Sequence, residues 1–339
     1  MALRDAIARV VDGHDLSEDA MAAAVETILA GGATPVQIAG FLVALRMKGE
    51  TVDELAGGAR ALRAHAVPVC DVPGGAVDTC GTGGDGTGTL NVSTAAGLVA
   101  AAAGVPVAKH GNRAASGTVG GADVLEALGV RVDLPPEAAS ACLARVGFAF
   151  LFAPTYHPAL REAAAARREL GVRTVFNLLG PLANPAGVRR QVIGVFAPRW
   201  VEPVAAVLLR LGAERAWVVH GAGGLDELAL EGESTVAEVA HGAVRLATIR
   251  PADAGLPPAP LAALRVSSVA DAAARLRGVL EGERGPMRDV VCLNAAAALV
   301  VADAAPDLRA GAALAARTID GGAARTLLAR LVAFTTERA

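Results

Sequence analysis

Two patterns of apolar residues divide the chain near residue 70. Over residues 1–66, apolar side chains recur at helical spacing, and residues that favour helix starts precede each run. Ser17 is followed by acids, Thr34-Pro35 places a proline at a first helical position, and Thr51-Val52-Asp53-Glu54 has the form of a capping box. This region is predicted to be all helical, and Pro68–Gly75 is predicted to be a linker.

Beyond the linker, short apolar runs alternate with helical segments. The predicted strands are Ala76–Thr79, Val105–Ala108, Phe148–Phe152, Gln191–Phe196 and Ala216–His220. The predicted helices between them are Ser93–Ala103, Gly121–Leu128, Pro136–Val146, Pro158–Leu170 and Trp200–Leu211, each followed by a glycine where a C-cap glycine belongs. Residues 234–250 are predicted to form an antiparallel hairpin or edge, and the rest is predicted to be helical.

This alternation predicts the fold class. Apolar strands alternating with helices are typical of a parallel sheet that is covered on both faces. We therefore expect an α/β protein, with a small all-helical domain and a larger domain whose mostly parallel central sheet is flanked by helices. The division expected is residues 1–72, joined by helices from about 158–185, and residues 73–339.

Composition narrows the class of partner. The 339 residues are 53% hydrophobic and carry a net charge of −3, and no long basic block occurs, so a nucleic-acid partner is not expected. No signal peptide is recognised, and Pro106 and several glycines interrupt the longest apolar run, Ala95–Ala108, so no membrane contact is expected either. The four cysteines form no CxxC pair and are expected to be buried thiols of a cytoplasmic protein.

A glycine-rich stretch, DTCGTGGDGTGTLNVST, begins at Asp78 between a predicted strand and a predicted helix. Its backbone N–H groups can approach an anion closely, and the helix points its positive end at the same place. Gly81, Gly83 and Gly86 form a GxGxxG pattern, which would favour a dinucleotide fold. However, the glycines continue beyond that pattern, the next strand ends in Lys109-His110 rather than in an acid, and no P-loop lysine follows. A structural turn would need only one or two glycines, so we predict a phosphate-rich ligand.

Two polar clusters accompany this stretch. Asn91, Ser93 and Thr94 stand at the predicted helix start, where a simple cap is the alternative to phosphate or magnesium binding. Lys109-His110-Gly111-Asn112-Arg113 follows the next predicted strand. Because ligands of open α/β sheets bind at the carboxyl ends of strands, we expect this cluster to meet the glycine-rich stretch, with a solvated charged loop as the alternative.

Acids and arginines later in the chain complete the candidate site. Asp226-Glu227 follows a predicted strand and a glycine-containing turn, and Mg²⁺ is commonly held by one or two carboxylates plus substrate phosphates. Four arginines, Arg161, Arg167, Arg168 and Arg173, precede the apolar, proline-containing segment Thr174–Pro185. Such a segment beside a basic helix could receive an aromatic carboxylate. Solvated surface charges are the alternative for both groups.

The chain contains, in this order, GTGGDGTGTLNVST, KHGNRAAS, GADVLEALG, RRELGVRTVFNLLGPLANP and GLDEL. These motifs resemble the anthranilate phosphoribosyltransferases of tryptophan biosynthesis, and the resemblance runs essentially end to end. It implies a pentosyltransferase that joins anthranilate to phosphoribosyl pyrophosphate (PRPP) and releases pyrophosphate, with Mg²⁺. It also implies an active site at the hinge between the two domains and a homodimer formed through the helical domains.

The resemblance also implies site residues. Those expected to contact PRPP are Gly81, Gly84, Asp85, Thr89, Asn91, Val92, Ser93, Thr94, Lys109, His110, Gly111, Asn112, Arg113, Ser116, Gly117 and Gly121. Those expected to hold Mg²⁺ are Ser93, Asp226 and Glu227, and those expected around anthranilate are Gly81, Asn112 and Arg167, with His110, His157 and Gly180 nearby. No acid, base or nucleophile is expected; Lys109 is expected to stabilise the charge of the leaving pyrophosphate.

Three positions depart from the family pattern. Gly117 and Gly121 stand where the family usually has serines, and Gly223 stands where an acid is often found. Two hydroxyl contacts to PRPP are therefore expected to be missing, with backbone N–H groups as substitutes.

Two alternatives stay open. One is a pyrimidine nucleoside phosphorylase-like enzyme, whose counterpart of KHGNRAAS has a serine-glycine-arginine core. The other is a non-catalytic, nucleic-acid-binding relative of the same fold, which the acidic pI near 6.1 and the presence of Lys109, Asp226 and Glu227 disfavour.

Overall fold

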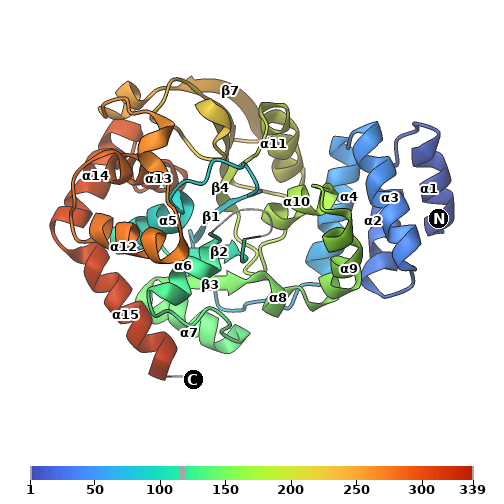
Figure 1. Cartoon of the computed structure of the whole chain (residues 1–339), viewed down its shortest axis with the longest axis horizontal. Helices are drawn as coiled ribbons and strands as arrows, with labels where there is room; N and C mark the ends of the chain where they lie inside the picture. The colour runs from blue at the N-terminus through green and yellow to red at the C-terminus, as the bar shows by residue number, and fades with distance from the viewer. Residues whose placement is uncertain (1, 115–118, 338–339) are drawn as a thin grey trace.

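The N-terminal region is helical, as predicted. A computed structural model describes residues 2–114 and 119–337 and shows this region at one end of the molecule (Figure 1). Its helices are α1 (Leu3–Val11), α2 (Glu18–Leu29), α3 (Pro35–Lys48) and α4 (Val52–Ala64). The predicted helix starts are confirmed, because Ser17 caps α2 and capping boxes at Thr34 and Thr51 open α3 and α4.

Two later helices join this bundle. α9 (Arg161–Leu170) and α10 (Val175–Leu179) lie beside α2, α3 and α4, and Ala163, Ala166 and Phe176 belong to the same buried cluster as the bundle. The predicted helix over Pro158–Leu170 is wrong in its first turn, which is a separate 3₁₀ turn at Pro158–Leu160. The packing of α4 on α2 is close, since a Cβ on Gly57 would lie 2.1 Å from the carbonyl oxygen of Glu18.

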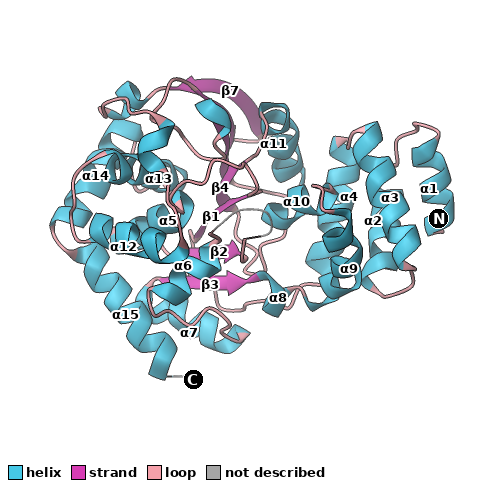
Figure 2. Ribbon diagram, viewed as in Figure 1, coloured by secondary structure: helices cyan, strands magenta, loops and turns pink. Residues whose placement is uncertain are grey.

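The larger region is built on a seven-stranded sheet (Figure 2). The strands are β1 (Val77–Gly81), β2 (Val107–Gly111), β3 (Phe148–Phe152), β4 (Arg190–Gly194), β5 (Arg215–Gly221), β6 (Ser234–Ala240) and β7 (Ala243–Ile249). Their order is β3-β2-β1-β4-β5-β6-β7; the first five pair in parallel and the last two form an antiparallel hairpin at one edge. The predicted α/β class, the mostly parallel sheet and the hairpin at 234–250 are confirmed.

Helices cover both faces of the sheet. The remaining helices are α5 (Val92–Ala102), α6 (Gly121–Ala127), α7 (Pro136–Val146), α8 (Ala153–Tyr156), α11 (Val201–Arg210), α12 (Val269–Leu280), α13 (Pro286–Val301), α14 (Leu308–Asp320) and α15 (Ala323–Glu337). Alternate strand residues point to opposite faces. Val192 packs in the cluster that contains α5 and α13, and its neighbour Ile193 packs in the cluster that contains α11 and the helical bundle. The core of the bundle is therefore continuous with one face of the sheet.

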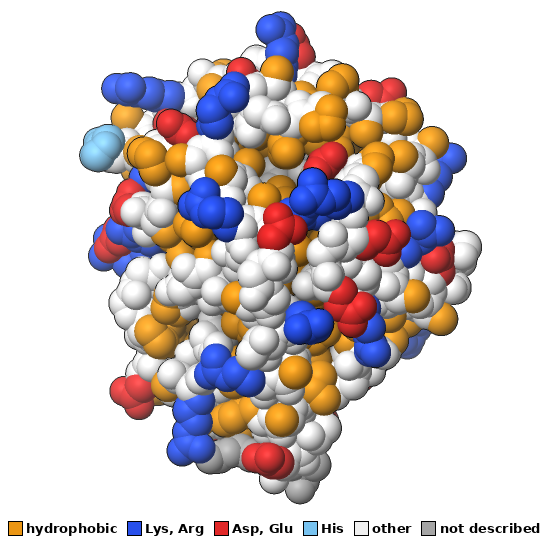
Figure 3. Space-filling model, turned by 90° about the vertical axis from the view of Figure 1, so that its left-hand side faces the viewer, with side chains coloured by type: hydrophobic (Ala, Val, Ile, Leu, Met, Phe, Trp, Pro, Cys, Tyr) orange, Lys and Arg blue, Asp and Glu red, His pale blue; other side chains and the backbone are white. Residues whose placement is uncertain are grey.

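Local features of the sequence explain several element ends and the surface. Five helices end at the glycines predicted as C-caps, and all five have positive φ: Gly104, Gly129, Gly147, Gly171 and Gly212. One prediction about the cysteines is wrong, because Cys70 is exposed in the connecting segment while the other three are buried. Among the described helices none is long and apolar enough to cross a membrane. The face shown in Figure 3 carries basic and acidic side chains interspersed, without a patch of one sign.

Candidate active site

The glycine-rich stretch forms an anchored loop at the carboxyl end of β1. Gly83, Gly84, Gly86 and Gly88 all have positive φ, between 62° and 77°, a region that residues with a Cβ rarely adopt. The loop is tied to its neighbours at both ends: the N–H of Thr82 donates to the carbonyl of Gly194 at 2.9 Å, and that of Leu90 donates to the carbonyl of Leu264 at 2.8 Å. The glycines are therefore needed for the path of the backbone as well as for access to it.

The acidic pair meets this loop. The Asp226 carboxylate accepts a hydrogen bond from the N–H of Gly83 at 2.9 Å, and the Glu227 carboxylate accepts one from the N–H of Ser93 at 3.0 Å. No side chain of the flanking residues caps α5, so Glu227 caps it from a distance. Glycines allow this approach: a Cβ on Gly81 would lie 2.9 Å from the Asp226 carboxylate, and one on Gly194 would lie 1.5 Å from the Asp226 carbonyl oxygen.

The electrostatics of the pair fit a cation. Burial, together with the charge of Asp85, raises the pKa of Asp226, and burial, together with the charge of Asp226, raises the pKa of Glu227. The carboxylates of Asp85, Asp226 and Glu227 thus approach one another. The charge of Lys109 opposes the rise in the pKa of Glu227. Within residues 2–114 and 119–337 no three His, Cys, Asp or Glu side chains form a metal-binding group. An ion held by Asp226 and Glu227 would need oxygens from a ligand or water as well, which suits Mg²⁺.

The second polar cluster lies at the end of β2, next to the glycine loop. Lys109 is buried, with 3% of its surface exposed, and its Nζ donates to the carbonyl of Thr79 in β1. The N–H of His110 donates to Asp78 at 3.1 Å, and the Asn184 amide donates to the other oxygen of Asp78 at 2.8 Å. Burial raises the pKa of Asp78, and the charge of Lys109 opposes that shift. Asp78 and Asn184 were not predicted as site residues; an acid inside an apolar strand was the signal for Asp78.

Two histidines, His110 and His157, come together next to the backbone of Gly180. The ring centroids of His110 and His157 are 5.0 Å apart, and both rings are buried. Burial lowers the pKa of His110 to about 3 and that of His157 to about 4, while the backbone of Gly180 acts in the opposite direction on His110. Both rings are therefore neutral at pH 7. Because Nε2 of His157 donates to the carbonyl of Ala183 at 2.9 Å, its Nδ1 is left as an acceptor without a partner, and Nε2 of His110 also lacks one within the described structure.

Three other predicted site residues, Arg167, Arg113 and Asn112, make no hydrogen bond to the glycine loop among the described residues. Arg167 lies on α9 with its guanidinium carbon 5.4 Å from the ring centroid of Phe176, and burial lowers its pKa. Arg113 pairs with Asp123 at 3.1 Å and with Glu126, so its charge is already compensated. Asn112 is exposed and its Oδ1 accepts from the N–H of Arg113 at 2.8 Å. The structure thus places Arg167 on the bundle side of the site and turns Arg113 towards α6.

Most hydroxyl and amide groups near the start of α5 are buried or hydrogen-bonded within the protein. Thr94 is buried, and a Cβ on Gly121 would lie 3.1 Å from its Oγ1. Asn91 donates to the carbonyl of Val119 at 3.1 Å, and its Oδ1 is buried without a partner among the described residues. Asp85 accepts from the N–H and hydroxyl of Thr87 at 3.1 and 2.7 Å, and the Thr87 and Thr89 hydroxyls are 3.2 Å apart. Val92 is buried. Ser116 and Gly117 lie outside the described residues.

These parts meet at the point where the chain reverses direction across the sheet. It runs from β1 outward to β2 and β3 and then crosses to β4 on the other side of β1, and such switch points bind ligands. The architecture matches two sequence models: the helical bundle domain of the glycosyl transferase family over residues 4–66, and the a/b domain of the glycosyl transferase family over residues 74–325. The helical bundle and the α/β domain together define a glycosyl transferase of this class.

More specific relatives narrow the class. The chain is 53% identical over 329 residues to an anthranilate phosphoribosyltransferase of Rhodopseudomonas palustris (strain BisB5), covering 97% of each chain. It is 56% identical over 331 residues to that of Rhodospirillum rubrum, covering 98% of this chain and 95% of the relative. The crystal structure of the Thermus thermophilus enzyme superposes with a TM-score of 0.93 at 48% identity, over 99% of this chain and 100% of the other. The chain belongs to the anthranilate phosphoribosyltransferase family.

The family resemblance expected from the motifs is therefore confirmed. A more distant member, from Saccharomyces cerevisiae in complex with PRPP and Mg, has a TM-score of 0.90 at 26% identity, over 99% of this chain and 98% of that one.

Proposed function

We propose that the protein transfers the phosphoribosyl group of PRPP to the amine of anthranilate and releases pyrophosphate. The observation that carries this proposal is the meeting of the anchored glycine loop, Lys109 and the Asp226-Glu227 pair at the carboxyl ends of neighbouring strands. The neutral rings of His110 and His157 pair directly after Lys109, next to the backbone of Gly180. One half of the site suits a polyphosphate, and the other suits a small aromatic molecule.

The phosphate side is assigned to the glycine loop and the start of α5. Backbone N–H groups of the loop from Gly81 to Thr89 and the positive end of α5 would bind the phosphates, helped by Ser93 and Asn91. Lys109 would neutralise charge that develops on the departing pyrophosphate. The expected loss of hydroxyls at Gly117 and Gly121 leaves more of this binding to backbone groups.

Asp226, Glu227 and the Ser93 hydroxyl are the residues proposed to hold Mg²⁺. When bound, Mg²⁺ would supply positive charge that favours pyrophosphate as a leaving group. In the ligand-free protein, the two carboxylates accept hydrogen bonds from the amides of Gly83 and Ser93. Binding of metal and phosphate would therefore release these two amides, which also lie where a phosphate is expected.

The acceptor side needs little chemical activation. The anthranilate amine is neutral at pH 7, so its lone pair can attack C1 of the ribose directly; the N–C1 bond forms, the C1–O bond to pyrophosphate breaks, and the amine loses a proton to water. Arg167 would bind the anthranilate carboxylate, and the neutral rings of His110 and His157, with Asn112 and Gly180, would line the pocket. Catalysis would come from positioning and charge stabilisation.

Loss of anthranilate fluorescence on mixing with PRPP and Mg²⁺ tests the proposal, with uridine plus phosphate as a parallel substrate pair. Loss that requires both PRPP and the metal is the expected result. Turnover of uridine with phosphate would instead favour a nucleoside phosphorylase. Tight binding of single-stranded nucleic acid at moderate salt, without turnover, would favour a binding protein.

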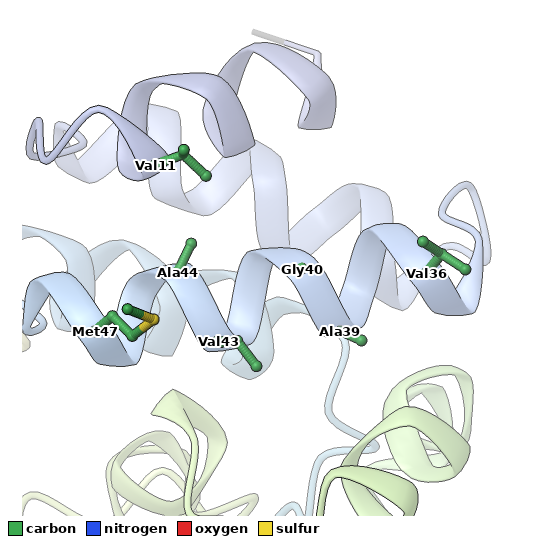
Figure 4. Close-up of a pocket in the computed structure, with 7 residues that line it drawn as sticks. All are labelled: Val11, Val36, Ala39, Gly40, Val43, Ala44 and Met47. Carbon is green, nitrogen blue, oxygen red and sulfur yellow. The ribbon is translucent and has the colours of Figure 1, made fainter.

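An apolar surface on the helical bundle supports a homodimer. It lies on α1 and α3 (Figure 4), where Val36 and Met47 are each 83% exposed and Val11 is 66% exposed. Its lining residues are Val11, Val36, Ala39, Gly40, Val43, Ala44 and Met47. Large exposed apolar side chains that share one surface are typical of an interface. We assign this surface to a second copy of the chain, in a cytoplasmic dimer.

Sedimentation velocity of a double variant tests this assignment. Replacing Val36 and Met47 by lysine should yield a folded monomer, because two buried charges would face their symmetry mates. Leu246→Lys, at a position 59% exposed on β7, is the matched control and should leave the dimer intact. A monomeric unaltered protein would refute the assignment. We further propose that the helical domain comprises residues 1–72 and about 158–185, because α9 and α10 pack against α2, α3 and α4.

A further inference from the structure

Arg173 bridges the helical bundle and the glycine loop. It lies between α9 and α10, and its Nη2 donates a hydrogen bond to the carbonyl oxygen of Gly84. Its guanidinium carbon is 4.5 Å from the ring centroid of Phe196, just after β4. Among the hydrogen bonds of the described residues, this is the only one that joins the bundle and its two added helices to residues 82–89 of the loop.

The backbone at Arg173 is held by the helical bundle. Its backbone carbonyl accepts a hydrogen bond from Arg46 of α3, and the capping box of Thr174 fixes the start of α10 immediately after it. Substitutions of the Arg173 side chain leave both of these interactions available. A change at this position therefore alters the contact with the loop and not the course of the bundle backbone.

The contact determines how one peptide group of the loop is oriented. Gly84 has a φ of 71°, and a glycine peptide in such a loop can flip at low cost. The carbonyl of Gly84 and the N–H of Asp85 belong to the same planar trans peptide and point in opposite directions. When Arg173 holds the carbonyl, the N–H of Asp85 is directed away from the bundle.

Phe196 ties the same contact to the start of the loop. Its N–H donates to Oγ1 of Thr82 at 3.0 Å, and the N–H of the next residue, Gly83, donates to Asp226 at 2.9 Å. The guanidinium therefore lies over the ring of a residue whose backbone N–H bonds to Thr82, and it bonds itself to the loop two residues further on, at Gly84. A planar, always-charged group suits this arrangement better than the flexible ammonium of a lysine.

We propose that Arg173 is a positioning residue for the donor substrate: from the helical bundle, it holds the glycine loop in the conformation whose amides bind the phosphates. This inference rests on the proposed function for the identity of the ligand. Arg173 has no carboxylate partner among the described residues, so its side-chain contacts near the loop are those with Gly84 and Phe196.

Steady-state kinetics of a small variant set tests the proposal. Arg173→Ala should raise the KM for PRPP by about tenfold, because a charged hydrogen bond and a stacking contact are lost, while kcat and the anthranilate KM change by less than about twofold. Arg173→Lys should recover part of the loss, to about threefold. The control is Arg277→Ala, an exposed α12 arginine without a side-chain partner among the described residues, which should leave both KM values unchanged.

A double-mutant cycle distinguishes positioning from direct contact with the substrate. Phe196→Leu should raise the PRPP KM by about threefold, and adding it to Arg173→Ala should have almost no further effect, because both act through one contact. Additive effects would overturn the proposal and show that Arg173 binds the phosphates itself. An unchanged PRPP KM in Arg173→Ala would overturn it as well.

Hydrogen exchange provides a readout that needs no substrate. The amides of residues 83–87 should exchange several-fold faster in Arg173→Ala than in the unaltered protein, with the bundle helices unchanged. Equal exchange would overturn the proposal even if the proposed reaction is correct. Conversely, a failure of the unaltered protein to bind PRPP by calorimetry would remove the proposed function, while faster loop exchange would still establish that Arg173 orders the loop.

Discussion

Gly194→Ala tests how the acidic pair is placed against the sheet. Gly194 ends β4, and a Cβ there would lie 1.5 Å from the carbonyl oxygen and 2.5 Å from the carbonyl carbon of Asp226. Since Cβ contacts below 3.0 Å essentially never occur, the backbone at Asp226 must move by about 1.5 Å. The obstacle is a main-chain carbonyl, so no side-chain rotation can relieve it.

The expected loss of activity is large and the expected loss of stability is modest. A misplacement of about 1 Å near reacting groups can lower activity by about 100-fold, so kcat/KM should fall by about that factor or more. Overpacking at one position typically costs about 1–3 kcal/mol, which a protein of this size survives. Because Asp226 and Glu227 move away from Gly83 and Ser93, half-maximal activity should also need more Mg²⁺.

The assay is the anthranilate fluorescence assay over a range of Mg²⁺ concentrations, with thermal unfolding followed by circular dichroism. Gly81→Ala is a graded comparison, since its Cβ would lie 2.9 Å from the movable Asp226 carboxylate, and it should lose only about tenfold. Gly74→Ala is the control, because nothing lies within 4 Å of its added Cβ. If Gly194→Ala kept activity within about threefold of the unaltered enzyme, with the same Mg²⁺ dependence, the acidic loop would not act from this position.

Three further predictions concern other parts of the site. Arg167→Ala should raise the anthranilate KM about tenfold and more than the PRPP KM, because a guanidinium–carboxylate pair is lost; an unchanged anthranilate KM in steady-state kinetics would remove that assignment. Asp226→Ala with Glu227→Ala should abolish Mg²⁺-dependent turnover in a metal titration, and activity with the usual metal dependence would count against the metal role. Burial lowers the pKa of His157 from 6.5 to about 4, so the folded protein should lose about 2–3 kcal/mol of stability as the pH falls from 6.5 to 4, where only the unfolded state binds the proton. His157→Gln should remove that part of the decrease in urea unfolding at several pH values, and an unchanged pH dependence would contradict it.

The fold could be predicted from local signals to a large extent. Capping residues at Ser17, Thr34 and Thr51 determine helix starts through contacts within one turn, and the C-cap glycines do the same for helix ends. The alternation of apolar strands with helices leads to a parallel sheet because each strand must return by a helix to the same edge. The separate turn at Pro158–Leu160 was missed, since both it and α9 are compatible with one helical pattern.

Some residues of the candidate site could also be predicted from the sequence, and others could not. The glycine loop, Lys109-His110 and Asp226-Glu227 stand next to strand ends, so the rule for open sheets was enough to bring them together. Asp78 and Asn184 could not be paired in advance, because 106 residues separate them and their contact depends on the segment that returns from the bundle. Arg113 is of a residue type that often binds phosphate, but two acids of α6, Asp123 and Glu126, already compensate its charge.

The sequence by itself determined the helices, the parallel sheet and the family, because these follow from residue type and spacing over short stretches. Tertiary structure alone decided that Arg173 reaches Gly84, that Glu227 caps α5 and that Gly194 must lack a side chain. Each of these contacts joins segments far apart in the chain at separations of a few ångströms. Such separations depend on how the bundle and the sheet pack together, which no local pattern of residues encodes.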